Sequence, residues 1–507
     1  MGLWFYLLAS MCLYVFIQAL INVVNNKKLP PSPPTIPILG NIFWLLKSSK
    51  NFSDLEPLLR SLRSKFGNIV TIHIGSTPSI FITSHEAAHR ALVKNGTVFA
   101  GRPLALQTTQ VFFPNQYTVS TCPYGPVWRL LRQNFMQLIQ PSRLNLYSHC
   151  RKWALSILKK HLLTDIELGN KAIPVNDYFS FTLYVLLSYI CFGDKFDEVT
   201  VKNIQRVQHS LIHNFIRFNV LNFLPTLSKI VFRNLWKEVL EIRQNQVSIF
   251  LPIIKARQKK LKSKDGVEGE EFEAYVDTLF DVKLPNNGNK LNDEELVSLC
   301  SEFMLGGTDT TATTMLWAMA NLVKYQNIQE KLFSEIKEVV KPGEDIEERH
   351  LKKMPYLKAV VLETFRRHPP GHFILPRAVT QDTIMDGHYI PKNAMVNFLV
   401  AELGWDPNVW EDPMEFKPER FLKHIEGDAK FDLKGFREIK MMPFGAGKRV
   451  CPAISMALLH LEYFVANLVR DFKWTLEDGC EVDMSEKQAF TIVMKNPLRP
   501  CVSPRIT

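Results

Sequence analysis

A short glycine-rich stretch near the carboxyl end, residues 444–453, constrains this chain more than any other feature. It reads Phe-Gly-Ala-Gly-Lys-Arg-Val-Cys-Pro-Ala, and the glycines at 445 and 447 permit tight backbone turns just before Cys451. Pro452 suits the first position of a helix, because its missing N–H would be unpaired there anyway. We therefore expect Cys451 immediately before a helix, where backbone N–H groups and the helix dipole favour a thiolate, the form of cysteine that binds metals. A buried structural thiol is the alternative.

Composition places the chain among large globular proteins. Its 507 residues exceed the roughly 250–300 at which a single core usually stops growing. Hydrophobic residues make up 46% and charged residues 22%, which argues against extensive disorder. The net charge is +11, but no basic module interleaved with aromatic residues is present, so we expect no nucleic-acid binding. An anionic membrane surface or an acidic protein partner accounts better for the charge. The eight cysteines form no CxxC pair, which favours a reducing compartment.

The amino-terminal segment Leu3–Val24 has 22 residues without a charge. As a helix rising about 1.5 Å per residue it reaches about 33 Å, enough to span a bilayer core. Lys27 and Lys28 follow at once, so the positive-inside rule leaves the rest of the chain on the cytosolic side. A cleavable signal peptide is the alternative, but its apolar core is shorter, about 7–15 residues, and follows a basic leader. We therefore predict a transmembrane signal anchor over residues 1–24.

The remainder of the chain reads as a hinge and one globular domain. Closely spaced prolines predict a stiff, extended hinge over residues 25–40. No linker long enough to separate domains is evident afterwards, so residues 41–507 are predicted to form a single domain. Two early runs, Ile69–Ile74 and Ser79–Thr83, are typical of strands, whereas helical patterns dominate after about residue 125. We expect a mainly α-helical fold with small β-sheets.

Residues 292–325 are predicted to form one long apolar helix, because Asn292-Asp-Glu-Glu supplies the acidic first turn that the helix dipole favours. The middle of this helix, residues 306–311, reads Gly-Gly-Thr-Asp-Thr-Thr, and each glycine costs about 1 kcal/mol in a helix interior. The glycines leave room for a ligand near the backbone, and a threonine hydroxyl can bond the carbonyl four residues back and open the helix. Asp309 and Thr310 then supply a carboxyl and a hydroxyl for proton transfer. The alternative is a bent core helix whose threonines only bond to their own turn.

Several arginines stand where they could bind anions or form ion pairs. Glu363 and Arg366 are three residues apart on one predicted helix face, a spacing that carries little information alone. Trp128 and Arg132 are four apart and project from one helix face. Guanidinium groups bind carboxylates with two parallel hydrogen bonds, although a single arginine is more often a surface ion-pair residue. The other arginines of interest are Arg377, Arg420 and Arg449.

Together these motifs resemble the cytochrome P-450 superfamily. Residues Phe444, Gly447, Arg449 and Cys451 match its haem-binding signature, and Ala453 stands where the signature usually has glycine. Residues 306–311 match its oxygen-activation motif. The resemblance covers essentially the whole chain, with the motifs in the expected order. It is most similar to plant microsomal A-type members, the 89A subfamily first and the 77A subfamily second, on the stretches 295–303 and 368–377.

The resemblance implies a haem-thiolate fold preceded by one transmembrane helix, and it gives roles to the candidate residues. Cys451 would be the axial ligand of the iron in heme b and would push electron density onto it. Thr310 would steady the reacting oxygen, and Asp309 would pass protons to it. The residues implied to contact the cofactor are Trp128, Arg132, Arg377, Phe444, Arg449 and Cys451. The residues implied to form a structural triad that retains the haem are Glu363, Arg366 and Arg420.

The implied activity is that of a membrane-bound monooxygenase, which inserts one atom of O2 into a largely apolar organic substrate. Electrons would come from NADPH through a separate reductase, because the chain has neither a GxGxxG motif nor a recognisable flavin module. The implied location is the endoplasmic reticulum membrane, with a single pass and a cytosolic catalytic domain. Two alternatives are a haem-thiolate isomerase or dehydratase that needs neither O2 nor reductase, and a non-catalytic haem-binding protein. Retention of the acid–threonine pair argues against the first.

The substrate pocket is implied to be apolar and aromatic. The stretches that would line it are residues 104–117, 215–232, 303–307, 371–375 and 490–493. These residues do not distinguish a fatty acyl chain, a terpenoid, an aromatic specialised metabolite or a tetrapyrrole catabolite.

Overall fold

The computed structural model describes residues 13, 29–36, 40–41, 44, 55–74, 77–222, 225–263, 272–427 and 431–505. They divide into two compact units, each built from segments far apart in the chain. The first unit comprises residues 1–103, 372–411 and 432–450, and the second comprises residues 104–371, 412–431 and 451–507. The predicted transmembrane segment lies outside the described residues apart from Leu13.

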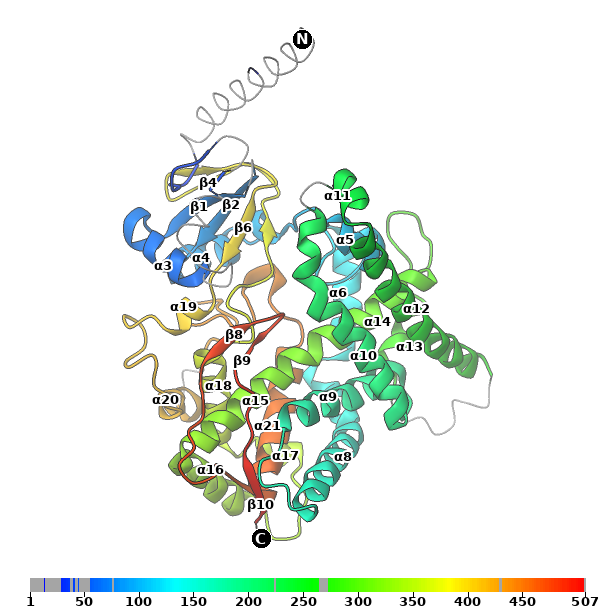
Figure 1. Cartoon of the computed structure of the whole chain (residues 1–507), viewed down its shortest axis with the longest axis vertical. Coiled ribbons are helices and arrows are strands. Elements are labelled where there is room, and N and C mark those ends of the chain that lie inside the picture. Colours follow the sequence, from blue (N-terminus) through cyan, green and yellow to red (C-terminus); the bar gives the residue numbers. More distant parts are fainter. Residues whose placement is uncertain are drawn as a thin grey trace. The chain divides into compact units, whose positions relative to one another are not determined.

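A four-stranded sheet in the order β1-β2-β6-β3 organises the first unit (Figure 1). Strands β1 and β2 are antiparallel, β2 and β6 are parallel, and β6 and β3 are antiparallel. Because side chains alternate across a strand, Val70 and Phe81 pack with helix α3 on one face, whereas Ile80 and Ile82 join a second apolar cluster on the other. The bounds are β1 Ile69–Ile74, β2 Thr77–Ile82, β3 Arg377–Ala378, β6 Met395–Phe398 and α3 Leu55–Phe66.

Short helices and a hairpin complete the first unit. Strands β4 and β5 pair antiparallel through a turn at Asp386 and Gly387, both of which have positive φ. The short elements are α4 His85–His89, η2 Arg90–Lys94, η3 Val98–Ala100, β4 Thr383–Met385, β5 His388–Ile390, α19 Ala401–Gly404 and η8 Gly447–Arg449.

The second unit is mainly helical. Its helices are α5 Gln107–Phe112, η4 Pro114–Gln116, α6 Pro126–Leu138, α7 Pro141–Leu144, η5 Asn145–Tyr147, α8 Ser148–Glu167, α9 Val175–Phe192, α10 Glu198–Phe215, η6 Arg217–Asn222, α11 Pro225–Val231, α12 Arg233–Lys262, α13 Tyr275–Leu279, α14 Asp293–Gly307, α15 Asp309–Lys324, α16 Gln326–Val339, α17 Glu348–Leu351, α18 Pro355–Arg367, α20 Glu419–Glu426 and α21 Ile454–Asp471. Its strands form two-stranded antiparallel sheets, β7 Phe472–Thr475 with β10 Cys501–Pro504 and β8 Glu486–Gln488 with β9 Ile492–Met494.

Helix α9 lies at the centre of the second unit. It packs against α8, α10, α14 and α15, and most of its side chains are buried. Among the described residues α9 is the helix long and apolar enough to cross a membrane. Its burial inside the unit accounts for that composition, because a helix that is apolar all round suits a protein core as well as a bilayer.

The prediction of a mainly helical fold with small sheets is confirmed, and two of its details are wrong. The second strand covers Thr77–Ile82 rather than Ser79–Thr83, since Pro78 is accommodated within it opposite His73. The predicted helix over residues 292–325 is two helices, α14 and α15, interrupted at Thr308 and ending at Lys324. Figure 1 shows them as consecutive green helices.

Candidate functional site

The cysteine of the glycine-rich stretch belongs to the second unit and precedes helix α21. The helix begins at Ile454, so Pro452 lies in a turn and is not the first helical residue, contrary to prediction. In this turn the N–H of Ala453 donates a hydrogen bond to the sulfur of Cys451 and so is not part of a regular helix start. Burial raises the pKa of Cys451, and this N–H and the guanidinium of Arg132 act in the opposite direction. The Ala453 N–H and the Arg132 guanidinium thus partly stabilise a thiolate at Cys451, and a bound cation would stabilise it further.

The glycines preceding the cysteine belong to the first unit and adopt the tight turn predicted for them. Gly445 and Gly447 have φ values of 68° and 70°, a region that favours glycine. A Cβ on Gly447 would lie 1.8 Å from the carbonyl oxygen of Leu92, so a side chain is excluded there. The half-buried Phe444 stands directly before this turn.

Two buried arginines of the first unit lie beside this glycine turn. Arg449 donates from Nε to the carbonyl oxygen of Ala100 at 2.5 Å. Arg377, at the start of β3, donates from Nη2 to the carbonyl oxygen of Arg449 at 3.5 Å. A Cβ on Gly445 would lie 4.0 Å from the same Nη2 atom. The structure therefore brings Arg377, Arg449 and the glycine turn together, with both guanidinium groups removed from solvent.

Helix α6 of the second unit presents Trp128 and Arg132 on one face, as the four-residue spacing predicts. The Arg132 guanidinium carbon lies 5.4 Å from the centroid of the Trp128 ring, a cation–π distance. Burial lowers the pKa of Arg132, and the charge of Cys451 acts in the opposite direction. Arg132 is therefore close enough to Cys451 for the two groups to interact electrostatically.

Thr308 separates α14 from α15 at the run of glycines and threonines. Its φ and ψ are −81° and −69°, and its hydroxyl donates to the carbonyl oxygen of Met304 at 2.8 Å. The hydroxyl of Thr310 donates in the same way to the carbonyl oxygen of Gly306 at 2.8 Å. Both features expected of this run, an opened helix and threonines bonded to their own turn, are thus present together. A Cβ on Gly306 would meet open space, whereas one on Gly307 would lie 2.5 Å from a methyl of Leu187.

Asp309 lies among polar side chains that the sequence did not reveal. Its Oδ1 is 3.6 Å from Nε2 of His209 on α10, and its Oδ2 accepts a hydrogen bond from the Thr308 hydroxyl at 3.3 Å. Tyr184 of α9 also lies beside it, and burial, followed by the Asp309 charge, raises the pKa of Tyr184 well above its ordinary value. Tyr184 therefore stays protonated at physiological pH. No sequence pattern signals this arrangement, because it depends on how three helices pack.

Glu302 of α14 is a second functional candidate that sequence reasoning missed. Its carboxylate accepts hydrogen bonds from the N–H groups of Val119 at 2.7 Å and Ser120 at 2.6 Å. Burial raises the pKa of Glu302, and these donors lower it. The carbonyl of Val119 in turn accepts a hydrogen bond from Nε1 of Trp128 at 3.1 Å. Glu302 thus fixes the loop that holds Trp128 and, through it, the face of α6 that carries Arg132.

The three residues of the predicted triad meet in the second unit. Glu363 is fully buried in α18 and accepts two hydrogen bonds of 2.7 Å from Arg366. Arg420 of α20 donates to the same carboxylate at 3.1 Å, and so does the N–H of Lys417 at 2.8 Å. Arg366 also donates to the carbonyl oxygen of Glu415 at 3.0 Å. A buried carboxylate with this many donors fastens α18 to α20 and to the segment preceding it.

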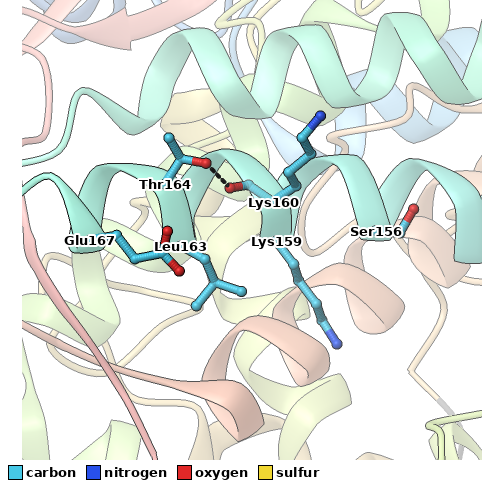
Figure 2. A pocket seen from close by; sticks show the side chains of 6 residues that line it. All are labelled: Ser156, Lys159, Lys160, Leu163, Thr164 and Glu167. Carbon is cyan, nitrogen blue, oxygen red and sulfur yellow. Dashed lines mark hydrogen bonds between the residues drawn. The ribbon is translucent and has the colours of Figure 1, made fainter.

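A hollow in the surface of α8 shares no residue with these groups. Figure 2 shows that the side chains along it all come from this one helix. The residues that line it are Ser156, Lys159, Lys160, Leu163, Thr164 and Glu167. An open hollow on one helix offers no converging polar groups, so we assign no role to it.

Comparisons with known proteins agree with this fold. A family model described as cytochrome P450 matches residues 30–501. Cytochrome P450 89A9 of Arabidopsis thaliana is 44% identical over 99% of this chain and 98% of its own length. Geranylhydroquinone 3''-hydroxylase of Arnebia euchroma is 29% identical over 96% of each chain. The solved structure of a zebrafish cytochrome P450 with abiraterone has a TM-score of 0.73 at 21% identity, and the match covers 89% of this chain and 99% of that one.

The donor set of this chain fits the cofactor of that family. Its members bind haem, an iron protoporphyrin IX, through a cysteine thiolate. Cys451 offers a sulfur with an N–H donor and a guanidinium already arranged around it. The recognition of an 89A-type sequence is likewise confirmed by the full-length identity. This chain therefore belongs to the cytochrome P450 family, with its similarity to a plant member of the 89A subfamily extending over nearly its whole length.

Proposed function

We propose that this protein is a membrane-bound haem-thiolate monooxygenase that inserts one oxygen atom from O2 into a largely apolar organic substrate. NADPH would supply the electrons through a separate reductase. Family membership supports the general reaction, because plant relatives of this kind are haem-thiolate monooxygenases. The observation that carries the proposal is the Asp309–Thr310 pair at an interruption in a helix, in the same unit as a cysteine sulfur that has its own donors.

When bound, the haem supplies dioxygen activation and electron transfer, and the chain supplies ligation, protons and exclusion of water. The sulfur of Cys451 would hold the iron, while the Ala453 N–H and Arg132 keep negative charge on that sulfur. For contacts with the rest of the cofactor we retain the sequence assignments. These are Trp128, Arg132, Arg377, Phe444 and Arg449, as the family resemblance implies.

Thr310 and Asp309 would handle the protons. The Thr310 hydroxyl donates to the Gly306 carbonyl at 2.8 Å, a bond that a rotation of the side chain releases. Because the space at Gly306 is open, a hydroxyl turned toward it can donate its proton to a reacting group there. Asp309, next in the chain, would resupply the proton at Thr310 Oγ1.

The apolar surroundings within the second unit favour an apolar substrate. Three of the stretches predicted to line the pocket pack into one apolar cluster that includes Phe112, Phe218 and Leu305. A fourth stretch reaches helix α15, because the hydroxyls of Thr313 and Thr491 lie 2.8 Å apart. Polar or charged substrates would lose hydration against these side chains without recovering it. We therefore propose an apolar plant metabolite, a class that includes a fatty acyl chain, a terpenoid, an aromatic specialised metabolite and a tetrapyrrole catabolite.

The test is incubation of microsomes containing the full chain and a plant reductase with NADPH and an apolar plant extract. Mass spectrometry should find products one oxygen atom heavier than their precursors, with the oxygen derived from isotopically labelled O2. The products should disappear without NADPH. Turnover that persists without NADPH, reductase and O2 would indicate the isomerase or dehydratase instead. Bound haem without product from any extract or pure apolar substrate would favour the non-catalytic alternative.

A further inference from the structure

His209 stands between solvent and the carboxylate that the proposed function uses for protons. It lies in α10, and its side chain is 30% exposed, whereas that of Asp309 is 18% exposed. Its Nε2 atom is 3.6 Å from Oδ1 of Asp309 and 3.4 Å from the hydroxyl of Ser180 on α9. One edge of the ring therefore faces the less exposed carboxylate of Asp309, while part of the residue reaches water.

Neighbouring groups hold the ring of His209 in this position. Its ring packs edge to face against Tyr184 of α9 with the centroids 5.5 Å apart, and against His213 of its own helix at 5.4 Å. Gln205 donates a hydrogen bond to the Ser180 hydroxyl at 3.1 Å, which fixes the polar neighbour of Nε2. The titratable groups that face His209 are thus Tyr184 from α9, His213 from α10 and Asp309 from α15.

These neighbours differ in what they can do with a proton. Tyr184 is buried and keeps its proton at physiological pH. The other oxygen of Asp309 is engaged by Thr308, which also donates to a backbone carbonyl. Histidine is the side chain that gains and loses a proton near neutral pH. Among the described residues that contact Asp309, His209 alone combines this property with access to water.

We propose that His209 is a positioning residue that pairs with Asp309 and transfers protons to it from solvent, an inference that rests on the monooxygenase function proposed above. In the transfer the N–H bond at Nε2 breaks and an O–H bond forms at Oδ1 of Asp309. The neutral imidazole keeps its proton on Nδ1 and takes a new one at Nε2 from hydronium, which becomes water, and no electron moves. Because 3.6 Å is long for a direct hydrogen bond, the transfer needs a small rotation of either side chain or one bridging water.

The proposal predicts that product formed per NADPH consumed depends on the imidazole of His209. In His209→Gln this ratio should fall about threefold to tenfold, less than the hundredfold or more of a direct general acid, because water can partly replace the ring. Because histidine side chains as a class exchange protons near neutral pH, a relay through an imidazole should also make this ratio depend on pH, and that dependence should disappear in the variant.

His161→Gln is the matched control, since Nε2 of His161 on α8 lies 3.6 Å from Oε1 of Glu198, the same separation as in the His209–Asp309 pair. It should keep both the ratio and the pH dependence of the wild type. A second measurement does not depend on turnover: the unfolding constants of His209→Gln, Asp309→Asn and the double variant. Coupling between the two substitutions should change the unfolding constant about twofold to fivefold, the range for partly exposed ion pairs.

Three outcomes separate this inference from the function on which it rests. A wild-type protein that forms no NADPH-dependent product overturns the proposed function. A productive wild type whose His209→Gln variant behaves like His161→Gln overturns the role of His209. Absence of coupling between His209 and Asp309 in the unfolding constants also overturns it, because the two side chains would then not act as a pair.

Discussion

Gly306 and Gly307 are neighbours in the chain, yet each is present for a different physical reason. A side chain at 306 would meet open space, so the glycine leaves room beside the backbone. A side chain at 307 would collide with Leu187, so that glycine allows α14 to approach α9 closely. The sequence shows only that both positions carry the cost of a helical glycine. Sequence reasoning assigned both to ligand access, and the geometry supports this for Gly306 alone.

The partly buried carboxylate of Glu462, in α21, makes the stability of the fold depend on pH. Burial raises its pKa from 4.5 to about 7, and Lys358 acts in the opposite direction. The folded state then binds a proton more tightly than the unfolded state, so stability falls as the pH rises from about 4.5 through about 7. We expect Glu462→Gln to raise the free energy of unfolding by about 1–3 kcal/mol above pH 7, because one pKa unit corresponds to about 1.4 kcal/mol and the side chain is only partly buried.

Urea unfolding of Glu462→Gln and the wild type at about pH 5 and about pH 8 checks this, because these pH values lie on either side of the pKa of about 7. The increase in the free energy of unfolding should be large at the higher pH and small at the lower one. Glu481→Gln, a change at an exposed position, should have no such pH dependence. A gain of equal size at both pH values would mean that packing rather than charge is responsible.

At the scale of elements, the interruption between α14 and α15 is the feature most closely tied to catalysis. Thr310→Ala removes the hydroxyl proposed to deliver protons, so we expect product per NADPH to fall about tenfold or more and hydrogen peroxide release to rise, with the haem retained. Thr314→Ala is the matched control, because its hydroxyl makes the same 2.8 Å bond to the carbonyl four residues back. Both substitutions replace threonine with alanine, which has the higher helix propensity. If the two variants form equal amounts of product per NADPH consumed, the Thr310 hydroxyl contributes only to the interruption between α14 and α15.

The junction of α18 and α20 gives a prediction about folding rather than chemistry. Glu363→Gln leaves two buried guanidinium groups without their carboxylate, so we expect a loss of about 3–5 kcal/mol in the free energy of unfolding and weaker haem retention. Glu238→Gln removes the carboxylate of an exposed pair with Arg217 and should cost at most about 1 kcal/mol. Urea unfolding and haem-to-protein ratios compare the two. Costs of similar size would show that the buried cluster does not hold α18 to α20.

Local sequence patterns predicted helices and their faces well. Contacts between segments far apart in the chain could not be predicted, because they depend on how the elements pack. The helix start predicted at residues 292–295 is present in α14, and Asn292 and Glu295 also cap it with reciprocal side chain to backbone hydrogen bonds of 2.9 Å. The Trp128–Arg132 face followed equally from a four-residue spacing. By contrast, Glu302 bonds a loop in a distant part of the chain, so no local pattern could reveal it. His209 was missed for the same reason.

At the scale of the whole molecule, the predicted anchor is separate from the residues that carry the chemistry. Removal of residues 1–28 should leave a foldable haem protein with weaker membrane attachment, because the described hydrogen bonds to strand β1 start at Pro30 and Pro31, after the cut. Some attachment should remain, since the 211–236 region exposes apolar side chains that include Ile230 and Val231. Carbonate extraction of both forms measures this. A shortened form that resists extraction as strongly as the full chain would show that the segment is not the principal anchor, and glycosylation at Asn51 or Asn95 would invert the proposed topology.

The central claim is that Cys451 ligates the haem iron, and the spectrum of the reduced, carbon monoxide-bound protein tests it most directly. The full-length wild type should show the strongly red-shifted Soret band of thiolate ligation, which gives the family its name. Cys501→Ala, a change of the partly exposed cysteine in β10, should keep this band. Cys451→Ala should lose it at equal or reduced haem content. Persistence of the red-shifted band in Cys451→Ala would contradict the account, because another residue would then hold the iron.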